Sequence, residues 1–340
     1  MSVEGGMPAM QSIEELALAL LVMAMAFIMG FAIRRGSICL VEASMLLVVK
    51  RRSLRLRAFA IALGAAGLVI IPLAWLIPGT VMLYPTWGVT GQLVAAAALF
   101  ALGARINGGC AFGTLSRLSV GNLSYGATLV GAVGGATLID PASEPSAATS
   151  QLGTPGWPGI AAIVLFLVLI WPALKMATLG NLHAALTRRE TLLRPTAAML
   201  VIGLVGGALF ALAQSWTYLS VLAAESRYWA GHASEKEGLR AVVGCCALLA
   251  GALFAAHRSG RFRLRWPSAA GLARHGLGGV IMGSAAASIP GSNGVLLLFG
   301  IPSGSVSAFV AYAVMSVVLM ASFVPARIRQ AQSRQDRSRS

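Results

Sequence analysis

The stretch NGGCAFGTLSRLSVGN, residues 107–122, separates two apolar segments of the chain. Glycines cluster around Cys110, although glycine weakens a regular helix by about 1 kcal/mol per residue. In a membrane, backbone that leaves the helix must be buried in protein or line a water-filled cavity. The stretch therefore predicts a re-entrant segment, with a short helix at 111–118 whose N-terminus carries Cys110 into the protein centre. A plain turn between helices is the alternative. The glycines are Gly108, Gly109 and Gly113.

Apolar segments of roughly 20 residues, the length of a helix that crosses about 30 Å of hydrocarbon, recur along the whole chain. Of its 340 residues, 57% are hydrophobic and only 11% are charged, whereas about a quarter of the residues of a soluble domain are charged. The mean hydropathy is +0.79. We therefore predict an all-α polytopic membrane protein with about nine transmembrane helices. Their expected positions are 13–33, 58–77, 89–107, 121–139, 159–179, 195–214, 239–257, 272–289 and 304–324.

The basic residues indicate the orientation of these helices. The formal net charge is +15, but the Lys and Arg residues lie between apolar segments, whereas nucleic-acid binding requires them to gather on one face of a module. They crowd 34–57, 175–194, 258–274 and the C-terminal tail, while 78–88 and 140–158 contain none. Since Lys and Arg favour cytoplasmic loops, we expect the N-terminus outside, the C-terminus inside, and anionic membrane lipids as partners.

Two glycine-rich breaks resemble each other in spacing. GARINGGCAFGTLSRLSVGN, residues 103–122, and GSAAASIPGSNGVLLLFGIPSG, residues 283–304, each follow an apolar segment and run through a short apolar piece into another glycine. By the helix count they open from opposite sides of the membrane. This arrangement is typical of two inverted pseudo-repeats with short re-entrant helices.

The connections indicate how the chain is divided. The loop 140–158 is rich in Pro and Ser and separates two pseudo-halves, about 13–139 and 159–325. Together they form a single integral membrane domain over 1–330. The basic residues 331–340 have no apolar partner, so we predict that this tail is disordered.

A second cysteine follows the first apolar segment, in GFAIRRGSICLVEA, residues 30–43. A short helix at about 37–49 carries Cys39 in its first turn. A helix N-terminus presents unpaired N–H groups and about half a positive charge, so it suits an anion. The alternative is that Cys39 packs as a small residue and that the preceding basic residues only mark topology. The segment before it ends in Arg34, Arg35 and Gly36.

A few other polar side chains are candidates for a functional role. Arg105 and Arg117 bracket the first break, and an ionisable residue at membrane depth is a functional candidate, although both can extend to the cytoplasmic surface instead. Cys245 and Cys246 lie in a continuous helical pattern and are expected to pack as small residues. The histidines lack the spacing of a helical metal pair, and no nucleotide-binding or hydrolase motif occurs. We therefore expect no metal, no cofactor and no ATP-driven step.

Two of these motifs carry a resemblance to a known family. FIMGFAIRRGSIC and GARINGGCAFGTLSRLSVGN resemble the hallmark sequences of the YeeE/YedE family of sulfur-compound (thiosulfate) transporters. The resemblance implies a transporter, not an enzyme, in the bacterial cytoplasmic (inner) membrane, with two inverted halves and short helices that dip inward. It also implies uptake of thiosulfate or a related small sulfur-containing anion, passed between cysteine thiols. On that pattern Cys39 and Cys110 occupy the family's first two functional cysteine positions.

The sequence departs from the family at its third cysteine. GGVIMGSAAASIPGSNG, residues 278–294, resembles the family's second glycine-rich segment, but this chain has Pro290, Gly291 and Ser292 where a cysteine is expected. A hydroxyl donates a hydrogen bond more strongly than a thiol. Ser292, or the amides around Gly291 and Asn293, are therefore candidates to replace the missing thiol.

The leading hypothesis is a transporter that carries a small sulfur-containing anion past cysteine thiols and half-helix N-termini. Two alternatives stay open: a membrane thiol redox or persulfide-carrying protein, and a non-transporting scaffold for a soluble sulfurtransferase-like partner. The predicted substrate path consists of Cys39, Cys110, Arg34, Arg35, Gly36, Gly108, Gly109, Gly113, Arg105, Pro290, Gly291, Ser292 and Asn293.

Overall fold

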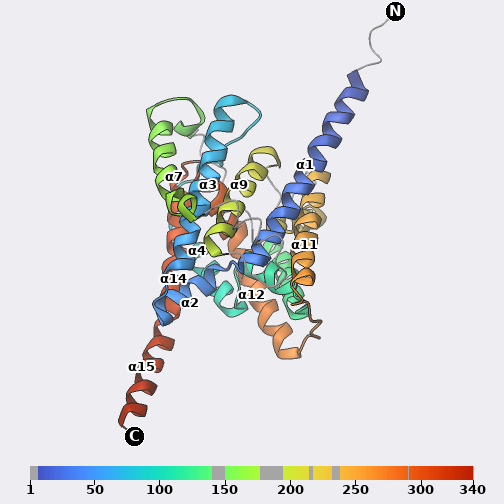
Figure 1. Ribbon diagram of the computed structural model, residues 1–340. Helices are drawn as coiled ribbons and strands as arrows, with labels where there is room; N and C mark the ends of the chain where they lie inside the picture. Colours follow the sequence, from blue (N-terminus) through green and yellow to red (C-terminus); the bar gives the residue numbers. More distant parts are fainter. Residues whose placement is uncertain are drawn as a thin grey trace, which may run out of the picture.

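The computed structural model describes residues 7–139, 150–176, 194–213, 217–231, 238–289 and 291–339. Within these ranges the protein consists of helices and connecting turns and has no β-strand (Figure 1). The helices form a bundle, from which the first helix projects at one end and the last helix at the other. The predicted all-α polytopic class is confirmed.

Each predicted apolar segment contains a helix, although the ends differ from the prediction by several residues. These helices are α1 (Met7–Gly36), α3 (Leu54–Leu76), α4 (Gly91–Asn107), α6 (Gly126–Thr137), α7 (Trp157–Met176), α9 (Pro195–Ala213), α11 (Leu239–Arg258), α12 (Ala269–Ser288) and α14 (Val306–Ser322).

Shorter helices interrupt this series at the breaks in the chain. The predicted short helices at 111–118 and about 37–49 are present as α5 and α2. The short elements are α2 (Leu40–Lys50), α5 (Ala111–Leu118), α10 (Tyr218–Trp229), α13 (Asn293–Val295), the 3-10 helices η1 (Leu123–Tyr125) and η2 (Gln151–Gly153), and the π-helix η3 (Leu296–Gly300).

The number of membrane-crossing helices differs from the expectation of nine. In the described part of the chain, seven helices are long and apolar enough to cross a membrane, or eight if α12 and the bent continuation Asn293–Gly300 form one span. The angle between those two pieces is 49°. Helix α6 has only 12 residues, because the segment predicted at 121–139 begins with a positive-φ glycine and the turn η1. About 20 residues are needed to cross the hydrocarbon, so nine spans are not confirmed.

The breaks before the two cysteines have identifiable backbone causes. Helix α4 ends at Gly108, whose φ of 75° is left-handed and whose N–H bonds to the carbonyls of Ala104 and Arg105. Glycine adopts this conformation without a steric penalty and commonly ends helices in this way. After α1, Ser37 also has a positive φ, of 51°. Each turn stops a long helix and restarts the chain as a short one.

Helices α1 and α11 run parallel to each other. The Glu15 carboxylate near the start of α1 pairs with the Arg240 guanidinium near the start of α11. Further along, the rings of Phe27 and Phe254 lie 5.7 Å apart. Helices α3 and α9 form a second parallel pair, in which Gly203 and Gly207 allow close approach to α3.

The contacts between helices also indicate an internal symmetry, in which matched helices of two sets exchange partners. When α1, α2, α3, α4 and α6 are matched in order with α9, α10, α11, α12 and α14, the contacts of one set have counterparts in the other. The α1–α11 contact matches α9–α3, α6–α12 matches α14–α4, and α2–α14 matches α10–α6. An inverted repeat would produce such a pattern. The repeat itself stays a prediction.

The C-terminal segment is helical in the structure, where the sequence predicted disorder over 331–340. Helix α15 (Val324–Arg339) continues from α14 and projects from the bundle (Figure 1). The expectation rested on the absence of apolar residues. The segment is nonetheless rich in Arg and Gln, which have high helix propensity.

Candidate functional site

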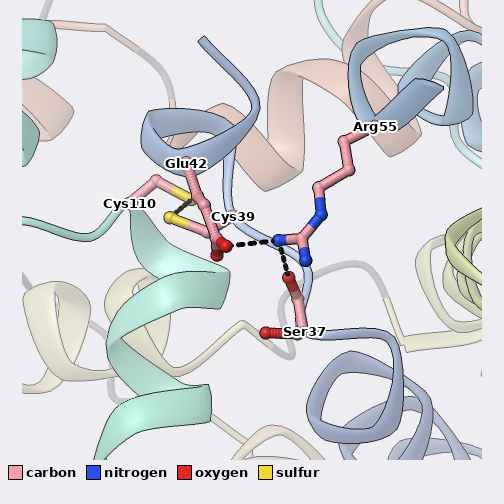
Figure 2. Close-up of polar contacts among 5 residues, drawn as sticks. All are labelled: Ser37, Cys39, Glu42, Arg55 and Cys110. Atoms are coloured by element: carbon pink, nitrogen blue, oxygen red, sulfur yellow. Dashed lines mark hydrogen bonds and ion pairs between the residues drawn. The ribbon is translucent and has the colours of Figure 1, made fainter. Parts of the chain in front are cut away.

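Cys39 and Cys110 face each other at the centre of the candidate site (Figure 2). Their sulfur atoms lie 3.9 Å apart, although the residues are 71 positions apart in sequence. Both residues are free cysteines, and their exposed fractions are 5% and 1%. The structure thus brings together the two cysteines that the sequence singled out, in a place closed to bulk solvent.

Each cysteine is the residue that precedes a short helix. Cys39 is the N-cap of α2 and Cys110 is the N-cap of α5, and both have extended backbone. Neither side chain accepts a hydrogen bond from its own helix. Instead, the backbone N–H of Leu40, the first residue of α2, donates to the Cys110 sulfur over 3.3 Å. Two helix N-termini therefore converge on one point, where their partial positive charges favour an anion.

Gly113 explains how the two sulfurs come so close. A Cβ atom at this position would lie 2.5 Å from the Cys39 sulfur and 4.0 Å from the Cys110 sulfur. The first distance is far inside van der Waals contact, so the absence of a side chain leaves the space that Cys39 fills. Gly109 packs against the same turn of α5.

An ion pair holds the turn that carries Cys39. The Arg55 guanidinium lies 2.6 Å from the Glu42 carboxylate of α2, and the same nitrogen donates to the Ser37 carbonyl over 3.3 Å (Figure 2). Arg55 belongs to α3, so this contact fixes α2 and its preceding turn against a long helix. The sequence alone identifies Arg55 only as one of the basic residues that indicate the orientation of the helices in the membrane.

A buried network holds the turn that carries Cys110. The Asn107 amide donates to the Gly109 carbonyl and to the Thr114 hydroxyl, both over 2.8 Å. Its carbonyl oxygen receives the Thr128 hydroxyl and meets the His275 Nδ1, also at 2.8 Å. All four hydrogen-bonding positions of the Asn107 amide are thus used. This network could not be predicted from the sequence, because His275 lies 168 positions away from Asn107.

Asn293 brings the second glycine-rich break to the thiol pair. Its exposed fraction is 0%, and its side chain lies beside Cys110 without reaching hydrogen-bond geometry. Both amide atoms lack a hydrogen-bond partner among the described residues. The next residue, Gly294, abuts the Phe112 ring of α5. From α10, the Tyr218 hydroxyl donates to the Ala111 carbonyl over 2.7 Å, so a second short helix is fixed to the same place.

Gly291 and Ser292 lie on a separate cavity next to this site. They line it together with Trp87 and Arg227, two residues that sequence reasoning did not select. The Ser292 hydroxyl is 2% exposed and has no hydrogen-bond partner among the described residues. Pro290, also predicted for the path, lies outside the described residues.

Two of the predicted basic residues, Arg35 and Arg105, lie against aromatic rings. The Arg105 guanidinium lies over the Phe323 ring, 4.5 Å from its centroid, at the end of α14. Arg34 and Arg35 are buried at the end of α1, and the guanidinium of Arg35 lies 5.7 Å from the Phe31 ring centroid. Gly36 and Gly108 act through the backbone, since Gly36 packs against Ala198 of α9 and Gly108 ends α4. Among the described residues no group of His, Cys, Asp and Glu side chains is arranged to hold a metal ion.

Apolar membrane-crossing helices, broken by short helices that meet at a buried thiol pair, define a multi-pass membrane protein with an internal polar site. The family model described as "Sulphur transport" matches residues 35–321. The chain belongs to this family, the YeeE/YedE family, as the two cysteine motifs predicted. Because it is a transporter family, the protein is a sulfur-compound transporter and not an enzyme. No curated protein matches the chain.

Proposed function

We propose that the protein takes up thiosulfate or a related small sulfur-containing anion, which passes between the Cys39 and Cys110 thiols. The observation that carries this proposal is the unpartnered Asn293 amide beside the thiol pair. A buried amide without hydrogen bonds costs about 1–3 kcal/mol. An ion held between the thiols and the first N–H groups of α2 and α5 would provide the missing partner.

The donors at this point suit passage more than tight retention. A transport site must bind an ion well enough to admit it and weakly enough to release it. Thiols are weak hydrogen-bond donors, whereas a bidentate arginine clamp would hold the ion tightly. Thiosulfate offers a polarisable terminal sulfur to the thiols and oxygen atoms to the N–H groups and Asn293.

We place the protein in the bacterial cytoplasmic membrane, with the N-terminus outside and the C-terminus inside. The two ends of the chain project from opposite ends of the bundle (Figure 1). Lys50, Arg51 and Arg52 lie in one basic pocket with Arg327 of α15, so basic segments gather on the side of the C-terminus. Reaction of single cysteines at residues 86 and 331 with an impermeant reagent on whole cells tests this: only the first should react.

Uptake of labelled thiosulfate into proteoliposomes tests the function. Cys39→Ala and Cys110→Ala should each reduce uptake to the background of empty vesicles, because each removes one side of the thiol pair. Cys246→Ala removes an exposed cysteine and should transport like the wild type. Normal uptake by both buried-cysteine variants, at equal protein levels in the vesicles, would overturn the proposal.

The 3.9 Å sulfur separation also favours a second candidate, a thiol redox or persulfide carrier. A disulfide bond is about 2.05 Å long, so a small movement would join the sulfurs. Mass spectrometry of protein incubated with thiosulfate separates the two functions. In a carrier, one thiol would attack the outer sulfur of thiosulfate to form a persulfide and release sulfite, and the second thiol could displace hydrosulfide from that persulfide to leave a Cys39–Cys110 disulfide. A transport path leaves both thiols reduced.

A further inference from the structure

A cavity of about 310 Å³ lies between α10, α12 and the break that precedes α13. One face of α10 forms a wall of it, from Leu219 through Ala223 to Arg227, at the spacing of successive helical turns. A water molecule occupies about 30 Å³ in the liquid. The cavity therefore has room for a small tetrahedral ion together with several waters.

Four residues of the cavity lining, Trp87, Ser220, Arg227 and Ser292, carry a side-chain group that can donate a hydrogen bond. The indole Nε1 of Trp87 is buried and has no hydrogen-bond partner among the described residues, and the same holds for the Ser292 hydroxyl. Arg227 adds a guanidinium, and none of the described lining residues is acidic. An indole N–H and a guanidinium can only donate hydrogen bonds. A ligand that satisfies them must be an acceptor, and the arginine favours a negatively charged one.

The position of the cavity connects it to the thiol pair. Trp87 belongs to the connection between α3 and α4, which lies at the same end of the bundle as the start of α1 (Figure 1). At the inner end, Ser292 is followed directly by Asn293, whose amide lies beside Cys110. Other residues that line the cavity are small and apolar, including Ala286 and Ala287 of α12. Two adjacent residues, Ser292 and Asn293, therefore connect the cavity lining to the neighbourhood of Cys110.

We propose that Trp87, Arg227 and Ser292 form an outer binding site for a sulfur oxyanion, which captures the ion before it reaches Cys110. This proposal rests on the proposed function, because it supplies the entry step for the thiol pair. The ion's oxygen atoms meet the indole, guanidinium and hydroxyl donors. Its capture requires neither thiol.

Equilibrium binding of labelled thiosulfate to purified protein tests the site apart from transport. The variant Cys39→Ala/Cys110→Ala removes the thiol pair and should still bind the ion. Addition of Arg227→Gln should weaken this binding about tenfold, as expected for one lost charge-assisted hydrogen bond. Ser292→Ala, a smaller change, should weaken it by about threefold and guards against a folding defect in the arginine variant. Arg52→Gln removes the same charge from the exposed end of α2 and should bind like its parent.

Two outcomes would overturn the outer site. One is that the double-cysteine variant binds no thiosulfate, and the other is that Arg227→Gln and Ser292→Ala bind as tightly as their parent. Neither outcome would affect the proposed function, which fails if Cys39→Ala and Cys110→Ala each transport the ion normally.

Discussion

Short helices in the first half of the chain follow cysteines, whereas those in the second half follow hydroxyl residues. Cys39 and Cys110 precede α2 and α5, and neither accepts a hydrogen bond from its own helix. Thr217 precedes α10, and its hydroxyl accepts the Ser220 N–H in the usual capping contact. Ser292 precedes α13, and its hydroxyl accepts no hydrogen bond from the N–H groups of that helix. The comparison shows that of the four residues only Thr217 caps its own helix, and that the first N–H of α2 is bonded instead to the thiol across the site.

Among variants that keep both thiols, the largest effect is expected from Gly113→Ala, which places a methyl group on the Cys39 sulfur. Overpacking of this kind costs up to about 3 kcal/mol, which corresponds to about a hundredfold loss if the strain falls on ion binding. Thiosulfate uptake in proteoliposomes measures it. Gly134→Ala is the matched control, since a Cβ there meets nothing within 4 Å. Equal uptake by both variants would show that the thiol spacing does not matter.

Asn107→Ala should have the next largest effect, because it leaves Thr114, Thr128 and His275 without their shared partner. Each unpaired buried group costs about 1–3 kcal/mol, so we expect a lower melting temperature and about a tenfold loss of uptake. The control Asn122→Ala removes one local contact, to the Ser124 N–H. A melting temperature as high as that of the control would contradict the role of the network.

Ser292→Cys makes the second half more like the first and should have a smaller effect. Because a thiol donates more weakly than a hydroxyl, the KM for uptake should rise about threefold. Uptake at saturating thiosulfate should stay close to wild type. Ser322→Cys, at the end of α14, serves as the control, and an unchanged KM in Ser292→Cys would remove the distinction between hydroxyl and thiol at this break.

Arg55→Gln should have the smallest effect. The ion pair with Glu42 is partly exposed, with side-chain exposures of 26% and 30%, and such pairs contribute about 0.5 kcal/mol. About a twofold change in uptake is expected. Arg57→Gln on the same helix controls for the lost charge. A loss as large as that of Gly113→Ala would mean that the turn before Cys39 depends on this single contact.

Much of the fold could be predicted because it depends on local patterns. Apolar length located the long helices, and the glycines of 107–113 located the break and α5. Helix α6 was overestimated, because apolar length does not reveal where the backbone leaves the helix. Positive φ values at Gly121 and at Ser37, which is not a glycine, are set by packing as much as by sequence.

The candidate site was predictable in part. The two cysteine motifs identified the thiols, but their facing arrangement and the neighbouring Asn293 depend on long-range packing. Arg105 was predicted to line the substrate path because of its expected depth in the membrane. Its position over Phe323 depends on the end of α14, more than 200 positions later in the sequence. Trp87 and Arg227 could not be predicted, because neither lies in a motif that indicates a binding site.

The 3.9 Å between the Cys39 and Cys110 sulfurs has a consequence for the kinetics of transport. Two sulfurs at van der Waals contact leave no room for an ion between them, so on the proposed path the structure is an occluded state. Passage then requires α2 and α5 to separate transiently. When only a fraction of molecules is open, the apparent affinity falls by that fraction. Gly113 and Asn107, which set the resting distance, would then act on the opening equilibrium as well as on the site itself.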